Sequence, residues 1–135
     1  MNYNELKQNY PQAFDQFVNW YRKYFDLSMF SGFPKLDLGL LEQIISDDDS
    51  NLTRDLYEFF DGNAIYISVE IQRNMVSHKI YFLYYLREGE IDTMDDYMVG
   101  LIQYPNRAKA EEAAFVAAFE ILEQQLNKTL TREGD

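Results

Sequence analysis

Apolar residues in the first part of the chain recur at the spacing of a helix. Aromatic side chains follow one another at steps of four, three, four and three residues: Tyr10, Phe14, Phe17, Tyr21 and Tyr24. This period predicts an amphipathic helix with an aromatic face. Pro11 suits the first turn of that helix, where no N–H group is needed. Residues 3–9 are predicted to form a separate short turn before it.

Two shorter helices are predicted after a loop at 27–36. The first covers 37–46, and its apolar face is formed by Leu38, Leu41, Ile44 and Ile45. The second covers about 52–60, and its inward side chains are Leu56, Phe59 and Phe60. Both assignments follow from helical periodicity. Gly62 is predicted to adopt the left-handed conformation that commonly ends a helix.

The pattern then changes to alternation between apolar and polar residues, which is typical of strands. The inward positions of the first predicted strand, 64–73, are Ile65, Ile67, Val69 and Ile71. A turn at 74–77 leads to a second strand at 78–87, which is apolar on both faces and is expected to be covered on both sides. A third strand is predicted at 97–104, so that the three form an antiparallel meander.

The last predicted helix begins after Pro105, with Asn106 as its N-cap. Its apolar stripe is formed by Ala108, Phe115, Phe119, Leu122 and Leu126, and its small residues are Ala110, Ala114 and Ala118. The alanines are expected to let this long C-terminal helix pack closely on the sheet. The chain is therefore predicted to be one α+β domain over 1–127, with a frayed tail at 128–135.

Two stretches of the chain carry the motifs of a known group: RDLYEFFDGNAIYISVEI at 54–71 and NRAKAEEAAFVAAFEILEQQLN at 106–127. In them the chain resembles small uncharacterised proteins encoded by bacteriophages and prophages of gut bacteria. In that group a DLYDFFD helix precedes a strand hairpin, and an RxxAEEAAFxxAFEILE helix closes the chain. The resemblance implies a viral or mobile-element origin. It implies no activity and transfers no functional residue.

The net charge of the chain restricts the kinds of molecule that it is expected to bind. The 135 residues include 12 Lys and Arg against 23 Asp and Glu, which gives a formal net charge of −11. Phosphate backbones and anionic membranes require concentrated cations, so we expect neither direct nucleic-acid binding nor membrane binding. An acidic surface suits a basic protein partner, and it also suits solubility alone. The absence of cysteine excludes disulfides and cysteine-ligated zinc.

The N-terminal sequence MNYNELKQNY lacks the basic and apolar regions of a signal peptide. No apolar run approaches the length needed to span a bilayer. We therefore expect a soluble cytoplasmic protein, either a monomer or a homodimer.

The stretch DDDSNLTRDLYE at 47–58 has the ligand spacing of an EF-hand calcium loop. Oxygen-bearing side chains stand at Asp47, Asp49, Asn51, Thr53, Asp55 and Glu58. Leu52, however, stands where the loop needs glycine, and Arg54 stands where an apolar residue normally packs. The alternative is a helix start with acidic residues beside its positive end. We interpret the stretch as a hinge between two helices and predict no metal or other cofactor.

Acidic side chains form the candidate set for partner binding. They are Asp47, Asp48, Asp49, Asp55, Glu58, Asp61, Asp92, Asp95 and Asp96. Such a surface could occupy a basic groove that otherwise binds nucleic acid. We predict a protein-binding module, with inhibition of a host factor as one form of it. Two alternatives stay open: a metal-dependent or hydrolytic enzyme that uses the clustered carboxylates, and a structural or assembly protein.

No catalytic residue is predicted. His78 is the only histidine, and its place at a predicted strand start is typical of a surface residue; no nucleophile or orienting partner is evident. Tyr66, Tyr81, Tyr85 and Tyr104 could share one face of the sheet, as aromatic residues do in RNA-binding sheets. The predicted strands carry few cations, and we expect the first helices to cover this face.

Overall fold

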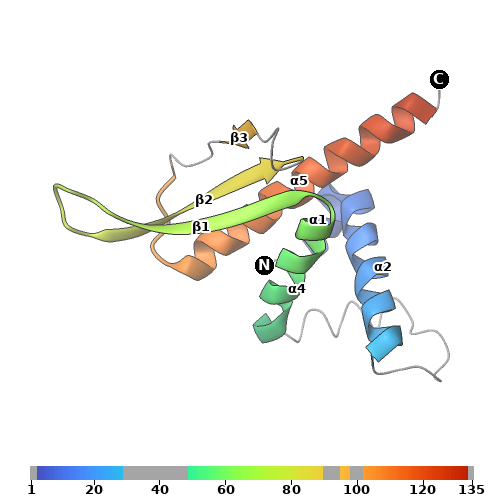
Figure 1. The fold of residues 1–135 in the computed structure, drawn as a ribbon, viewed down its shortest axis with the longest axis horizontal. Coiled ribbons are helices and arrows are strands. Elements are labelled where there is room, and N and C mark those ends of the chain that lie inside the picture. Colours follow the sequence, from blue (N-terminus) through green and yellow to red (C-terminus); the bar gives the residue numbers. More distant parts are fainter. Residues whose placement is uncertain (1–2, 29–48, 90–94, 98–101, 134–135) are drawn as a thin grey trace.

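The fold combines helices with an antiparallel β-hairpin, as seen in a computed structural model (Figure 1). It describes residues 3–28, 49–89, 95–97 and 102–133. The elements in chain order are α1 (Tyr3–Asn9), α2 (Pro11–Ser28), α4 (Asp49–Gly62), β1 (Ile65–Arg73), β2 (Ile80–Glu88), β3 (Asp95–Tyr97) and α5 (Arg107–Glu133). This arrangement confirms the α+β class. The predicted helix at 37–46 lies outside the described residues.

Helices α1 and α2 meet at Pro11, which begins α2 as predicted. Residues 3–9 form the helix α1 rather than an isolated turn. Helical hydrogen bonding continues across the junction, because the N–H of Tyr10 donates to the carbonyl of Leu6 at 2.8 Å. The predicted aromatic face is buried at Phe14, Phe17 and Tyr21.

Helix α4 begins at Asp49, earlier than the predicted start at 52. Its buried side chains are the predicted ones, Leu56, Phe59 and Phe60. The prediction of a left-handed Gly62 is wrong, because the positive φ falls at Ala64, with a value of 57°. The carbonyl of Ala64 accepts the N–H of Gly89 at 2.9 Å. The left-handed residue therefore lies where the chain entering β1 must align with the end of β2.

The strands β1 and β2 form a hairpin with an unbroken register. Pairing runs from Ile65 with Glu88 to Arg73 with Ile80. The predicted turn at 74–77 is confirmed. Strand β2 begins at Ile80 rather than at 78, because His78 belongs to the loop and has a φ of 60°.

Two short segments pair with β2 on the side opposite β1. β3 pairs antiparallel with the end of β2, with Tyr97 opposite Leu86, so that β2 lies between β1 and β3. Tyr104 forms a separate antiparallel bridge with Phe82. The predicted strand 97–104 contains both of these pairing residues, and 98–101 lie outside the described part.

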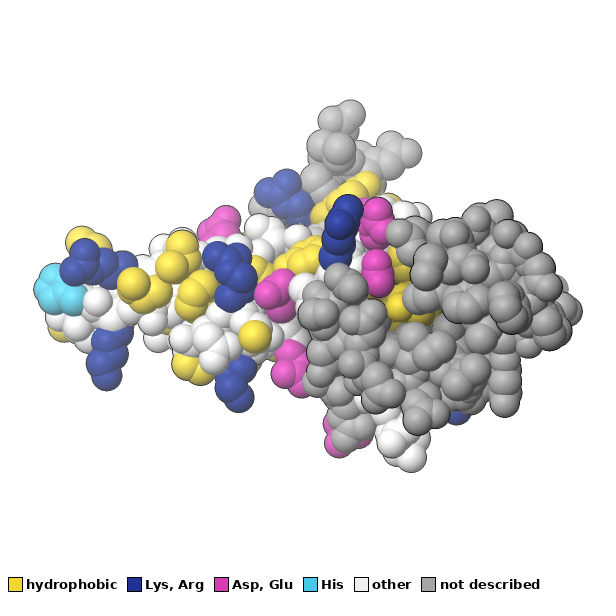
Figure 2. All heavy atoms as spheres, turned by 90° about the horizontal axis from the view of Figure 1, so that it is seen from below, with side chains coloured by type: hydrophobic (Ala, Val, Ile, Leu, Met, Phe, Trp, Pro, Cys, Tyr) yellow, Lys and Arg dark blue, Asp and Glu magenta, His cyan; other side chains and the backbone are white. Residues whose placement is uncertain are grey.

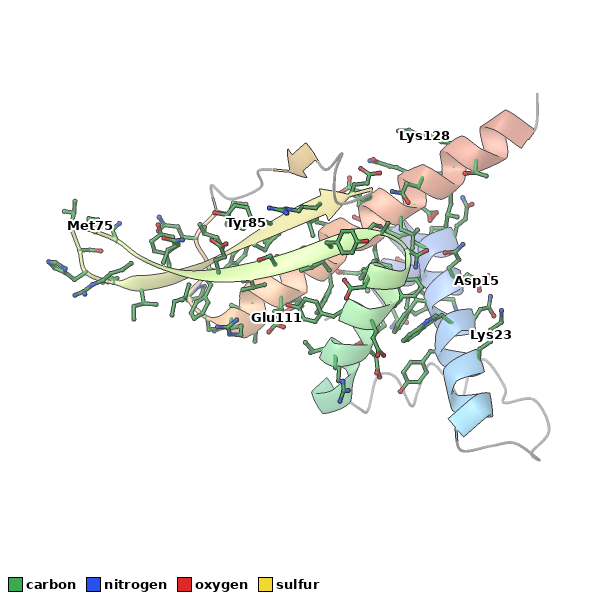
Figure 3. The ribbon with its side chains drawn as sticks, viewed as in Figure 1. Asp15, Lys23, Met75, Tyr85, Glu111 and Lys128 are labelled. Atoms are coloured by element: carbon green, nitrogen blue, oxygen red, sulfur yellow. The ribbon has the colours of Figure 1, made fainter. Side chains whose placement is uncertain are left out.

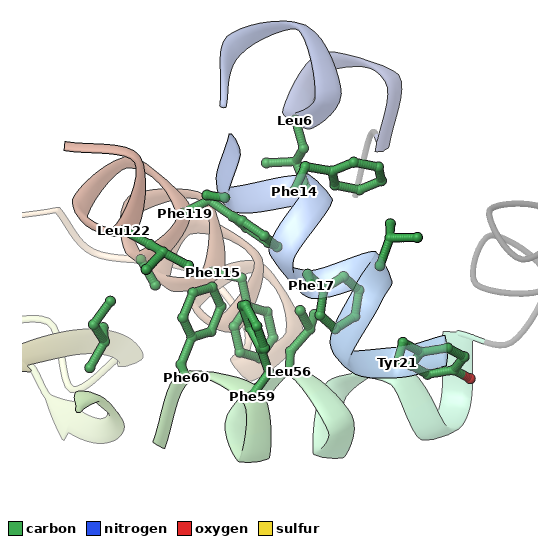
Figure 4. Packing of buried hydrophobic residues seen from close by; sticks show 14 residues of the cluster. Leu6, Phe14, Phe17, Tyr21, Leu56, Phe59, Phe60, Phe115, Phe119 and Leu122 are labelled. Atoms are coloured by element: carbon green, nitrogen blue, oxygen red, sulfur yellow. The ribbon is translucent and has the colours of Figure 1, made fainter. Parts of the chain in front are cut away.

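Helix α5 carries two apolar faces. One face lies against the hairpin and includes Ala113, Ala114, Ala117 and Ile121, which pack with Ile67, Tyr84 and Leu86. The other lies against α2 and α4 (Figure 4) and includes Phe115, Ala118, Phe119 and Leu122. Ala110, Ala114 and Ala118 are all fully buried. Ala114 packs with Tyr84 and Leu86 of the sheet, as predicted, whereas Ala118 lies on the face against the other helices. Ala108 is exposed, contrary to prediction, because it lies in the first turn, before the helix reaches the core.

Asn106 caps α5 as predicted, because its Oδ1 accepts the N–H of Lys109 at 2.9 Å. The helix passes residue 127 and continues to Glu133, so most of the segment predicted as a frayed tail is helical. Neither glycine nor proline occurs between Arg107 and Glu133 to end it earlier.

Aromatic rings from three helices meet in the core. The ring of Phe17 on α2 lies edge-on to Phe59 of α4 at 5.1 Å and to Phe119 of α5 at 6.0 Å between centroids. Phe60 also lies edge-on to Phe119, at 5.0 Å. Ring quadrupoles favour this geometry. Within the described part of the chain, none of the helices is long and apolar enough to cross a membrane.

Candidate functional site

The loop end of the β1–β2 hairpin extends beyond the helices. In Figure 1 it runs past the start of α5, and Figure 3 places Met75 at its far end. Exposure rises along β1 in the same direction, from 0% at Ile65 to 55% at Ile71. These two side chains point to the same face of the sheet. The rise in exposure from one to the other therefore shows where α5 stops covering that face. We call residues 71–82 the distal hairpin.

The tip of the distal hairpin has a fixed backbone conformation. Oδ1 of Asn74 accepts the N–H of Val76 at 2.9 Å and that of Ser77 at 3.0 Å. The carbonyl of Asn74 accepts the N–H of His78 at 2.8 Å. His78 closes the turn in the left-handed region, which histidine tolerates better than most residues do. The loop is therefore a closed turn that presents Met75 and Val76 to solvent.

Large apolar side chains gather at this end of the molecule. Among the described residues, five large hydrophobic side chains are more than half exposed: Ile71 (55%), Met75 (84%), Val76 (91%), Ile80 (58%) and Ile102 (55%). Four of them belong to the distal hairpin. Scattered single apolar residues are ordinary on a protein surface, whereas a group on one projecting element is typical of an interaction site.

The charge of the distal hairpin is opposite to that of the whole chain. Residues 71–82 contain Arg73 and Lys79 and no acid, so they contribute +2. The rest of the chain then carries −13, because the total is −11. Figure 2 shows the cations spread among apolar side chains at the end of the molecule that bears the histidine. The distal hairpin is therefore a basic and apolar element on an acidic protein.

Helix α5 adds a cation at the boundary of this region. The guanidinium of Arg107 lies 5.5 Å from the centre of the Phe82 ring, within the range of a cation–π contact. Phe82 pairs with Ile71 across the hairpin. Arg107 therefore marks the edge of the exposed apolar surface.

Three of the nine predicted acidic binding residues have described side chains. They are Asp55, Glu58 and Asp61 on α4. Glu58 and Asp61 are exposed, and Asp55 is half-buried. Partial burial, and then the charge of Glu58, raises the pKa of the Asp61 carboxyl. We call Glu58 and Asp61 the acidic pair of α4.

The other six acidic candidates lie wholly or partly outside the described part. The backbones of Asp49, Asp95 and Asp96 belong to α4 and β3, but their side chains are not described. Asp47, Asp48 and Asp92 lie outside the described residues. Whether the nine form one surface stays a prediction.

Helix α4 also determines the geometry of the calcium-loop pattern. The chain is helical from Asp49, and each helical residue turns by about 100° relative to the one before it. Asn51, Asp55 and Glu58 therefore start from one face of the helix and Thr53 starts from the opposite face, so the four positions do not surround one point. Within residues 3–28, 49–89, 95–97 and 102–133, no group of three or more metal-ligating side chains is placed to hold an ion.

A polar contact joins α4 to α5 close to the acidic pair. The hydroxyl of Tyr57 donates to Oε2 of Glu111 at 3.0 Å, and the Tyr57 ring lies edge-on to Phe115 at 5.1 Å. Burial, and then the charge of Glu111, raises the pKa of the Tyr57 phenol. The phenol therefore stays protonated and serves to hold the two helices together.

The predicted tyrosine face is formed only in part. The hairpin register places Tyr66, Tyr81 and Tyr85 on one face. Tyr104 packs on the opposite face, where its ring lies 5.9 Å from that of Tyr84. Helices α1 and α2 join the core made with α4 and α5, so the expectation that they cover the tyrosines is wrong. The sheet is instead covered by α5, on the face of Tyr84.

Sequence reasoning missed the distal hairpin as a site. A signal was present, because a run without acids at 71–87 is conspicuous in a chain with 23 acidic residues. Periodicity gave no indication that the apolar residues of this run would be left uncovered. Comparisons of the chain with protein-family models, curated proteins and solved structures gave no match. A function is therefore inferred from geometry and chemistry.

Proposed function

We propose that this chain is a protein-binding module whose binding element is the distal hairpin. The observation that supports this is the exposure of Ile71, Met75, Val76 and Ile80 on one projecting element. Burial of apolar surface contributes about 25 cal/mol per Å² to association before ordering costs are subtracted. A rigid, closed tip lowers those costs, because little backbone has to be ordered on binding.

The acidic pair of α4 is proposed as a second, polar contact. Exposed carboxylates at the rim of an interface speed encounter with a cationic partner and exclude acidic ones. Glu58 and Asp61 are both exposed and close enough for the charge of one to act on the other. An acidic protein-binding module is suited to a basic partner, so inhibition of a basic host factor is one form that the proposed binding function would take.

Assembly is the second candidate function. It is favoured by the position of β1 at the edge of the sheet. An open edge can add a strand from another chain, with main-chain hydrogen bonds as the source of affinity.

Affinity capture tests the proposed function. The tagged full chain is incubated with a lysate of cells that express the untagged chain, so that either a second copy or another protein can bind. Wild type is compared with a variant that carries Met75→Ser and Val76→Ser. The control is Ile102→Ser, which removes an exposed apolar side chain outside the distal hairpin. Circular dichroism confirms that all three chains are folded.

We expect a protein that is retained by wild type and by Ile102→Ser to be lost from the double variant. Deletion of two apolar anchors is expected to weaken capture about tenfold or more. Equal retention by all three chains, or no retention by wild type, would overturn the proposal.

A further inference from the structure

Strand β1 is an edge strand of the described sheet. The carbonyl of Ala64 accepts the N–H of Gly89, and on the other side of β2 Phe82 and Tyr104 exchange both backbone bonds at 2.9 Å. Hydrogen-bonded pairs alternate along an antiparallel ladder, so the even-numbered residues of β1 face β2. The residues that direct N–H and C=O outward are Ile67, Val69, Ile71 and Arg73. Across the described part of the chain, no residue bonds to these outward groups.

This edge lacks most of the features that usually prevent strand addition. Natural edge strands are interrupted by proline or bulges, are very short, or carry charged side chains. The nine residues of β1 include neither proline nor glycine, and its register with β2 has no bulge. Its charged side chains are Glu70 and Arg73, both exposed. The half of β1 next to the loop is thus a regular and accessible edge.

A second copy of β1 complements the first in an antiparallel pairing centred on Ile71. In that register Ile71 faces its own counterpart, and Glu70 faces Gln72, so no like charges lie directly opposite each other. A register centred on Glu70 would instead oppose two carboxylates. The pairing is centred in the exposed half of the strand, whereas α4 lies beside the start of β1 (Figure 1).

Charge favours the same arrangement. Antiparallel pairing sets the tip of each hairpin beside the base of the other strand, where α4 ends. The tip carries Arg73 and Lys79, and the end of α4 carries Glu58 and Asp61. Two chains that repel overall thus meet with unlike charges at the point of contact.

We infer that this protein forms a twofold dimer by antiparallel pairing of the β1 edges around Ile71. The inference rests on the proposed function, since it uses the same distal hairpin and names a second copy of this chain as the partner. Symmetry makes each contact occur twice, as in other isologous interfaces. The paired segments are short, so the dimer is expected to dissociate in the micromolar range.

Sedimentation equilibrium of the purified full chain tests this pairing. With no other protein present, the mass should rise from 16.1 kDa toward twice that value as concentration increases through the micromolar range. Ile71→Pro removes the N–H at the centre of the proposed pairing. It leaves the hydrogen bonds between β1 and β2 intact, because the N–H of Ile71 points away from β2. It is expected to weaken the dimer by about tenfold or more. Circular dichroism and melting temperature show whether this variant keeps its fold.

A charge pair at Gln72 tests the register and does not depend on proline. Gln72→Glu should weaken the dimer, because it sets a second carboxylate against Glu70 of the other copy. Gln72→Lys should strengthen it, and the two dissociation constants should differ by about tenfold over the two symmetric contacts. Gln16→Glu and Gln16→Lys, at an exposed position on α2, are the controls for the change in net charge and should differ little.

Three results would overturn the inference. The first is a monomer at every concentration. The second is a dimer that a folded Ile71→Pro variant forms equally well. The third is a dimer in which the Gln72 variants differ no more than the Gln16 variants do. Each leaves the proposed function to the capture experiment, in which loss of another protein from the Met75 and Val76 variant would still support it.

Discussion

The carboxylate of Glu123 on α5 caps the first turn of α2 at Ala13. Its Oε2 accepts the N–H of Ala13 at 2.8 Å, and its Oε1 accepts the N–H of Gln12 at 3.2 Å. Glu123 is the buried charged residue of the described core, 8% exposed. Because Pro11 offers no N–H, these two groups are the donors next in line at the positive end of the helix. A residue late in the chain thus completes a helix near its beginning.

Glu123→Ala is expected to destabilise the fold. It leaves two N–H groups without an acceptor in a largely buried site, at a cost of about 2–3 kcal/mol in the free energy of unfolding. Glu123→Gln keeps one acceptor and should cost about 1 kcal/mol. Urea unfolding followed by circular dichroism measures both. Glu120→Gln, at an exposed position on the same helix, is the control, and an equal loss there would contradict the capping role.

Ala64→Gly is expected to be neutral or stabilising. The φ of 57° at Ala64 costs a non-glycine residue about 1–2 kcal/mol. Glycine removes that cost, although it adds about 0.5–1 kcal/mol of unfolded-state entropy. The net gain should be near 0.5 kcal/mol. The control is Ala108→Gly within the helix, which should instead destabilise the fold by up to about 1 kcal/mol. Denaturant midpoints that shift in the same direction for both variants would contradict the prediction.

Tyr57→Phe is expected to lower stability and to flatten its dependence on alkaline pH. Loss of the hydrogen bond to Glu111 should cost about 1 kcal/mol at neutral pH. The pKa of Tyr57 is raised above 10.0 by burial and then by Glu111, so its contribution is complete below pH 10.0 and is lost as the pH rises above it. Unfolding at several alkaline pH values should therefore show a steeper loss in wild type than in the variant. Parallel curves would contradict the contact.

Asp61→Asn is expected to stabilise the fold at neutral pH. The pKa of Asp61 is raised above 3.8 by partial burial and then by Glu58. Its favourable contribution is therefore complete at lower pH and is lost as the pH rises through the raised pKa. Thermal melts from acidic to neutral pH should show this loss in wild type and not in Asp61→Asn. A variant less stable than wild type at neutral pH would show that the carboxylate serves the fold.

Sequence reasoning succeeded where one local cause dominates. The N-cap at Asn106, the start of α2 at Pro11 and the inward set Leu56, Phe59 and Phe60 were all predictable, because each depends on hydrogen bonding or periodicity within one element. It failed at Gly62, because the position of the bend depends on how β1 must meet β2. Ala64 takes the left-handed conformation even though glycine stands two residues away.

The candidate site was less predictable than the fold. The sequence indicated acidic residues as the binding set, because net charge is a property of composition. Exposure of Ile71 and Ile80 depends on where α5 begins relative to the sheet, and no local sequence pattern determines that position. Ile65 and Ile71 have the same place in the alternation, yet one is buried and the other is more than half exposed.

The sequence by itself determined the α+β class, the β-hairpin and the long last helix, because hydrophobic period and capping act over a few neighbouring residues. The tertiary structure decided three further features: the two apolar faces of α5, the capping of α2 by Glu123 and the uncovered basic end of the hairpin. Each of these depends on which residues distant in sequence come into contact. A projecting hairpin left partly uncovered by its own helix is the feature from which the binding proposals follow.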